Sequence, residues 1–177
     1  MKAITIREPW ATLMAIGAKQ IETRSWPTNY RGPIAIHAAK GMTGADADFL
    51  RHYNAKFLDA FNESRIHPIT GMPVALDEYF NIYDWNFEFA PATWFLQRTR
   101  GCVIATATLD CCGAFDAATH RRVIDRFGEN ELAFGDFTPG RFGFYLANVV
   151  RLPRPIPAKG QLGLWDWEPP VELRGAA

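Results

Sequence analysis

Cysteine is scarce in this sequence, with three residues among 177, at Cys102, Cys111 and Cys112. Three cysteines cannot all pair, and no further Cys or His pair stands at the spacing that zinc ligands need. These observations argue against a disulfide framework and against a zinc site. We therefore expect a protein of a reducing compartment, the cytoplasm, that carries no metal or other cofactor.

Long apolar runs and a basic N-terminal stretch are also missing. The chain goes directly into the short β-branched run Ala3–Ile6, and no later stretch has the length of a membrane span. This pattern predicts neither a signal peptide nor a transmembrane helix, and so no membrane partner.

The sequence has no excess charge of either sign, because 19 lysines and arginines balance 19 aspartates and glutamates. A neutral molecule has no overall cationic field to attract nucleic acid, so any such contact must come from a local patch. The residues that could form one, if the fold brings them together, are Arg24, Arg31, Lys40, Arg141 and Lys159. With 48% apolar and 21% charged residues, the chain has the composition of one soluble domain with a sizeable core.

Several motifs of well-known enzyme classes are absent. The sequence contains no Gly-x-Ser-x-Gly nucleophile elbow, no phosphate-binding glycine loop and no His-x-Glu with a paired Cys-x-x-Cys. Serine hydrolase, P-loop and zinc deaminase chemistry are therefore not expected.

A cluster of charged residues stands out between Gly17 and Lys40. In the predicted strand Gln20–Trp26, alternation places Glu22 and Arg24 on one face and Thr23 on the other, with Lys19 at the strand's start. One interpretation is a solvated ladder of charges on a hairpin that contributes little to stability. The other is a ligand site at a helix-to-strand corner, where rigid elements hold polar groups in place.

Three blocks of sequence resemble the ASCH domain family, which belongs to the PUA-like superfamily. The first block is Gly17-x-Lys19-x-x-Glu22-x-Arg24, with Pro9-Trp10 before it and Tyr30-Arg31-Gly32-Pro33 after it; the others are Gly135–Phe142 and Pro155–Trp165. The resemblance implies a single α+β domain over residues 1–177, built on a small mixed PUA-like β-barrel with flanking helices.

The hydrophobic pattern predicts the elements of this barrel. We expect helices at Pro9–Gly17 and Ala118–Phe127, an acidic turn at Gly128–Glu131, and strands at Lys2–Ile6, Gln20–Trp26, Ile34–Ala38, Gly101–Leu109, Phe142–Val149 and within Gln161–Trp167. Gln20–Trp26 and Ile34–Ala38 are expected to form two strands joined by a turn.

Residues 41–100 are predicted to be a helical and aromatic insertion between the second and third barrel strands. Helical spacing begins at Thr43, and the alternation Trp85-x-Phe87-x-Phe89 suggests a short strand. Padding of the barrel is the simpler role, and a lid beside the charged cluster or a dimer contact is the alternative. The oligomeric state stays open.

The resemblance implies binding of RNA, single-stranded nucleic acid or a modified nucleoside, because PUA-like barrels are associated with RNA and modified bases. The residues predicted to bind the ligand are Trp10, Trp26, Arg31, His37, Lys40, Asp136, Arg141 and Trp165. For Trp10 a core position, and for His37 a structural hydrogen bond, are the alternatives.

An enzymatic role also stays open, with Lys19, Glu22 and Arg24 as the candidate catalytic residues. The chain is similar to small bacterial amidohydrolases that act on acetylcytidine, whose Lys and Arg match Lys19 and Arg24. Their Thr nucleophile is replaced by Glu22, so Glu22 or a loop carboxylate would act instead as general base for water. A further catalytic Glu of those enzymes falls near Glu129 or Glu131. Ribonuclease activity is the second alternative.

Overall fold

The computed structural model describes residues 1–41, 43 and 99–171. The predicted insertion at 41–100, with its helix from Thr43 and its strand around Trp85–Phe89, lies almost wholly outside the described residues.

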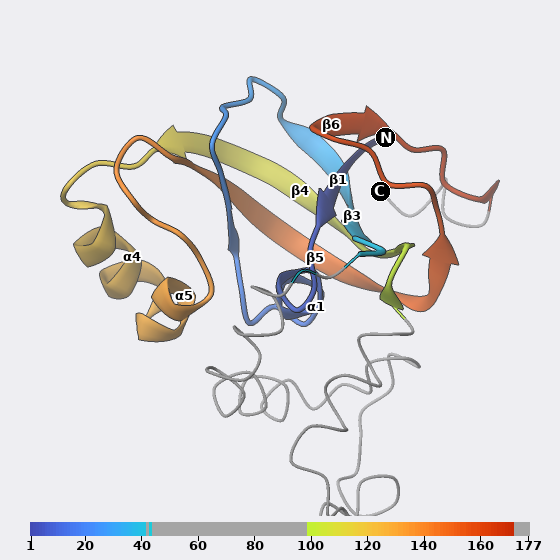
Figure 1. Cartoon of the computed structure of the whole chain (residues 1–177), viewed down its shortest axis with the longest axis horizontal. Coiled ribbons are helices and arrows are strands. Elements are labelled where there is room, and N and C mark those ends of the chain that lie inside the picture. The colour runs from blue at the N-terminus through green and yellow to red at the C-terminus, as the bar shows by residue number, and fades with distance from the viewer. Residues whose placement is uncertain (42, 44–98, 172–177) are drawn as a thin grey trace, which may run out of the picture.

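The described fold is a six-stranded sheet that curls into a half-barrel, with helices packed on it (Figure 1). Its strands are β1 (Lys2–Ile6), β2 (Ile21–Arg24), β3 (Gly32–Ala38), β4 (Cys102–Ala114), β5 (Phe142–Pro157) and β6 (Leu164–Asp166). The order is β2-β5-β4-β3-β1-β6, with β1 and β3 parallel and the other neighbours antiparallel. This mixed arrangement confirms the predicted α+β class.

The predicted pairing of the second and third strands is wrong. β2 pairs with β5, whereas β3 lies between β1 and β4. The composition of the two strands explains the difference: Ile34–Ala38 is buried at every position and occupies the middle of the sheet, whereas β2 carries charged side chains and takes its edge. In chain order, residues 41–100 follow β3 and precede β4, which are the third and fourth strands when β1 is counted as the first.

Helix α1 (Trp10–Ala15) fills the concave side of the half-barrel. Its residues 11–15 are all buried, and Ala11 and Met14 share a core cluster with Ile4, Ile36 and Phe144. The helix ends before Gly17, whose φ of 80° lies in the left-handed region that glycine adopts without strain.

Helices α4 (Thr119–Phe127) and α5 (Glu129–Ala133) belong to the segment of chain that connects β4 to β5. Val123 of α4 packs with Ile21 and Phe137 in a separate core cluster. The acidic turn predicted at Gly128–Glu131 is wrong, because these residues begin α5. Glu131 is buried, since its carboxylate accepts hydrogen bonds from the backbone of β2, and a buried anchor of this kind favours an ordered helix over a solvated turn.

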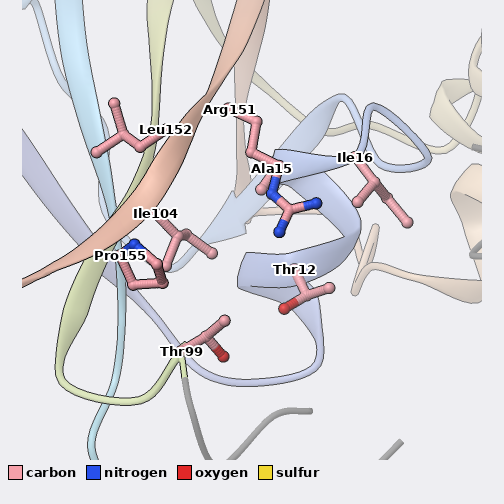
Figure 2. Close-up of a pocket in the computed structure, with 8 residues that line it drawn as sticks. All are labelled: Thr12, Ala15, Ile16, Thr99, Ile104, Arg151, Leu152 and Pro155. Carbon is pink, nitrogen blue, oxygen red and sulfur yellow. The ribbon is translucent and has the colours of Figure 1, made fainter. Parts of the chain in front are cut away.

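A buried carboxylate fixes the start of α1. Glu8 is 1% exposed and accepts hydrogen bonds from Thr12 N and Thr12 Oγ1 at 3.0 Å and from Thr99 Oγ1 at 2.6 Å. Burial raises the pKa of Glu8, and these hydrogen bonds oppose that rise. Beside it, α1 and β5 enclose a cavity of about 10 Å³, enough for one water molecule, into which the guanidinium of Arg151 extends from β5 (Figure 2).

Candidate functional site

A large cavity lies between the C-terminal end of β1 and the edge strand β2, which are not paired with each other. Its volume is about 650 Å³. No ladder joins β1 to β2, and the side chain of Arg24 spans the gap instead, with Nη2 donating to the carbonyl oxygen of Thr5 at 2.6 Å. The residues that line the cavity are Thr5, Ile6, Arg7, Trp10, Glu22, Thr23, Arg24, Ser25, Trp26, Leu132, Ala133, Phe134, Gly135, Asp136 and Arg141.

Two ion pairs border this cavity. Arg24 Nη2 lies 3.1 Å from Glu22 Oε1 on β2, and Arg141 Nε lies 3.1 Å from Asp136 Oδ2 on the loop before β5. Glu22 and Arg24 are two residues apart on one strand, so the predicted alternation places both at the cavity, although Thr23 also lines it.

The loop that carries Asp136 is held in place by hydrogen bonds within the loop and by one to β2. Asp136 Oδ1 accepts from Thr138 N and Oγ1, and Asp136 N donates to Thr23 Oγ1 on β2. The hydrogen bonds from Thr138 and the charge of Arg141 lower the pKa of Asp136, so its carboxylate stays ionised in neutral solution.

Two tryptophans supply flat apolar surface to the cavity. Trp26 is partly buried and packs edge-on against Phe144, with ring centroids 5.0 Å apart at 86°. Trp10 is also partly buried, and the guanidinium carbon of Arg7 lies 5.9 Å from the centroid of its ring. Trp10 therefore packs against the core with part of its ring and lines the cavity, which combines the two roles weighed from the sequence.

Lys19 is buried next to the cavity and does not line it. It is 1% exposed, its Nζ donates to the carbonyl oxygen of Ile21, and the same Nζ lies 3.8 Å from Glu131 Oε1. Burial lowers the pKa of Lys19, and the carboxylates of Glu22 and Glu131 oppose this. A solvated ladder of charges is therefore the wrong description of this corner.

Glu131 ties helix α5 to the beginning of β2. It is 2% exposed, and its two oxygens accept from Gln20 N and Ile21 N, each at 2.9 Å. Burial raises the pKa of Glu131, while Lys19 and the two backbone donors oppose the rise. Through this anchor, α5 and the segment after it are held against the strand that carries Glu22 and Arg24.

The remaining predicted ligand residues lie outside the cavity. The Arg31 guanidinium donates to the carbonyl oxygens of Thr28 and Tyr30 and stabilises its own turn. Lys40 is exposed just beyond the end of β3.

His37 and Trp165 form a separate buried contact on the other face of the sheet. His37 is 2% exposed, its Nε2 lies 3.1 Å from the carbonyl oxygen of Ala158, and its ring meets that of Trp165 edge-on at 5.7 Å. Trp165 Nε1 donates to Thr5 Oγ1 at 3.1 Å. These hydrogen bonds match the structural interpretation of His37 that the sequence offered.

A family model for the ASCH domain matches residues 4–109, which is more than half of the chain. The protein belongs to the ASCH domain family. The family is part of the PUA-like superfamily, in agreement with the curled sheet described above. No curated protein of similar sequence matches the chain.

The match covers one side of the candidate site of this ASCH domain. It includes β1, α1 and β2, and with them Arg7, Trp10, Glu22, Arg24 and Trp26. The opposite side of the cavity, from Leu132 to Arg141, comes from the part of the chain after the match.

Three contributors to the site were missed or only loosely placed from the sequence. Arg7 was not singled out, and its position three residues before Trp10 is the only local signal. Ser25 gave none. Glu131 was indicated only by the order of elements in related amidohydrolases, because a glutamate in an acidic stretch gives no sign of burial.

The described part of the ASCH domain contains no group of three or more His, Cys, Asp or Glu side chains that could hold a metal ion. None of its described helices is long and apolar enough to cross a membrane.

Proposed function

We propose that the cavity between β1 and β2 binds a nucleotide unit of RNA. The observation that carries this proposal is the combination, in one open cavity, of two tryptophan rings with three arginine side chains. Aromatic rings stack on bases of any sequence, and each such stack contributes about 1–3 kcal/mol to binding. Guanidinium groups match the geometry of phosphate oxygens. Membership of the ASCH family is consistent with RNA binding.

The charged side chains around the cavity support binding of a ligand that combines an anionic phosphate with the polar edge of a base. Among the described residues that line the cavity, three are arginines, Arg7, Arg24 and Arg141, and two are carboxylates, Glu22 and Asp136. Glu22 Oε1 is held by Arg24, whereas Glu22 Oε2 makes no hydrogen bond in the described structure. That oxygen can accept from the exocyclic amine of a base, as carboxylates do with cytosine.

Isothermal titration of the purified protein with nucleoside monophosphates, modified nucleosides and short single-stranded RNA tests the proposal. We expect binding by the wild type and a loss of about tenfold or more in Arg24→Gln, which removes the charge at the cavity. Lys2→Gln is the matched control, because Lys2 pairs with Asp166 at the opposite end of β1. Equal affinity in both variants, or no binding by the wild type, would contradict the proposal.

A second candidate function is hydrolysis of an N-acylated cytidine-type nucleoside. It is favoured by the buried Lys19–Glu131 pair, whose pKa values are shifted by burial, beside Glu22 at the cavity. In this reaction Glu22 would take a proton from water as the water oxygen bonds to the acyl carbon. Arg24 would stabilise the resulting oxyanion. Cleavage of the C–N bond would then release the amine, which receives the proton from Glu22.

Product analysis separates this hydrolase from a binding protein. The hydrolase predicts release of acetate from N4-acetylcytidine by the wild type and none by Glu22→Gln, even at nucleoside concentrations that saturate the variant. Shortening of the RNA in the same incubation would instead indicate ribonuclease activity.

A further inference from the structure

Two lysines from distant parts of the sequence, Lys40 and Lys159, stand beside Gly101 at one end of the sheet. The side chain of Lys40 runs along Gly101, where an added Cβ would lie 3.6 Å from Lys40 Cβ. The carbonyl oxygen of Gly101 accepts from Ala158 N at 2.9 Å, and Lys159 is the next residue. Gly101 therefore has Lys40 on one side and the backbone that leads into Lys159 on the other.

Both lysines are next to the cavity that we propose as the nucleotide site. Ala39 N, one residue before Lys40, donates at 2.8 Å to the carbonyl oxygen of Ile6, which lines the cavity. Gly160, one residue after Lys159, passes so close to Thr5, another lining residue, that an added Cβ would lie 2.9 Å from Thr5 Oγ1. The strand directions explain this, because the parallel strands β1 and β3 end at the same edge of the sheet.

The charges of these lysines are not neutralised within the described structure. Lys40 and Lys159 are exposed, and neither forms an ion pair with a described residue. The carboxylate that follows β1, that of Glu8, is buried and bound to Thr12 and Thr99. At the opposite end of β1, by contrast, Lys2 lies 2.9 Å from Asp166.

We propose that the ligand is a single-stranded oligonucleotide, and not a free nucleoside, whose phosphates next to the bound nucleotide lie on Lys40 and Lys159. This inference rests on the proposed function of the cavity. A free nucleoside would leave both lysines without a role, whereas a strand leaving the cavity past Ile6 and Thr5 meets both. Cationic side chains that follow a strand's backbone, beside aromatic rings that stack on its bases, are the usual features of single-strand binding.

The test compares a nucleoside monophosphate with an oligonucleotide of six nucleotides, as RNA and as DNA, on wild type and on Lys40→Gln/Lys159→Gln. We expect the double variant to weaken oligonucleotide binding about tenfold at low salt and to reduce the slope of log K against log salt by about 1.4, the value for two phosphate contacts on a single strand. Affinity for the monophosphate should stay the same. Whichever of RNA and DNA binds the wild type more tightly is taken as the natural ligand. The proposal requires that the double variant loses affinity for that ligand.

The control is Lys2→Gln, which changes one charge at the far end of β1, with Lys2→Gln/Arg121→Gln to match the charge change of the double variant. Arg121 is exposed on α4 and pairs with Asp125. If the monophosphate binds but the oligonucleotide binds no more tightly, or if the control lowers affinity as much as the double variant, the lysine contact is overturned and the cavity proposal stands. If neither ligand binds the wild type, both proposals fall.

Discussion

Two ion pairs on the same short strand contrast sharply in this protein. Lys19–Glu131 at the start of β2 is almost completely buried, at 1% and 2% exposure, and both partners also hydrogen-bond to the backbone of the strand. Glu22–Arg24, further along the strand, borders an open cavity and leaves one carboxylate oxygen available. The comparison indicates a division of roles, in which the buried pair positions the strand and the open pair meets the ligand.

Glu131→Ala should have the largest effect on stability. It leaves the Lys19 ammonium buried without its partner and the N–H groups of Gln20 and Ile21 without acceptors. Removing one partner of a buried pair costs about 3–5 kcal/mol. We expect a loss of this size in the free energy of unfolding, measured with urea.

The control for that variant is Glu129→Ala, an exposed glutamate on the same helix. Its change should stay within about 0.5 kcal/mol. Similar losses in the two variants would mean that Glu131 does not anchor β2.

Lys19→Met should cost less, about 2 kcal/mol, because methionine fills similar space and Glu131 keeps its two backbone donors. The same urea experiment measures it. A loss larger than that of Glu131→Ala would reverse the proposed order of importance within the buried pair.

Glu22→Gln should change stability by less than about 1 kcal/mol, because the amide has nearly the shape of the carboxylate, its oxygen can still accept from Arg24, and Arg24 keeps its bond to Thr5. Nucleotide binding should nevertheless fall about tenfold, since the amide replaces an acceptor that faces the ligand. Unfolding and titration on the same preparation measure both effects. A large stability loss with unchanged binding would assign Glu22 to the scaffold.

The smallest expected effect is a pH dependence of the free energy of unfolding that comes from His37, which lies away from the cavity. Burial lowers the pKa of His37, and its hydrogen bonds to the backbone oxygens of Ala158 and Gly101 oppose this. Its ordinary pKa is about 6.5, so below that pH the unfolded chain takes up the proton before the folded one. The stability that neutral His37 contributes is therefore present above pH 6.5 and lost as the pH falls below it.

His37→Gln should flatten this part of the stability curve relative to wild type. His120 is exposed on α4, and His120→Gln should leave this part of the stability curve unchanged. The difference between variant and wild type is the informative quantity, because Glu8 and Glu131, with raised pKa values, titrate in both proteins.

The sequence predicted the class of fold and one side of the site, and physical reasons explain where it stopped. Alternation correctly placed Glu22 and Arg24 together, because side-chain direction in a strand is a local property. Strand pairing depends on residues that are far apart in the sequence, so the predicted partner of β2 was wrong. The same limit applies to Glu131, which reaches Lys19 across 112 positions of sequence, and to Lys40 and Lys159, which meet only through Gly101. Arg24 and Arg141 were named together only as members of a possible cationic patch, because the fold decides whether such residues meet.

The most direct test of the account is the response of the tryptophan indole signals in two-dimensional NMR during titration with a nucleoside monophosphate. The signals can be assigned by single Trp→Phe substitutions. Binding in the cavity predicts that the signals of Trp10 and Trp26 move, while that of Trp167, buried in a separate cluster, stays in place. No movement of Trp10 and Trp26, or movement of Trp167 alone, would contradict the assignment of the nucleotide site to the gap between β1 and β2.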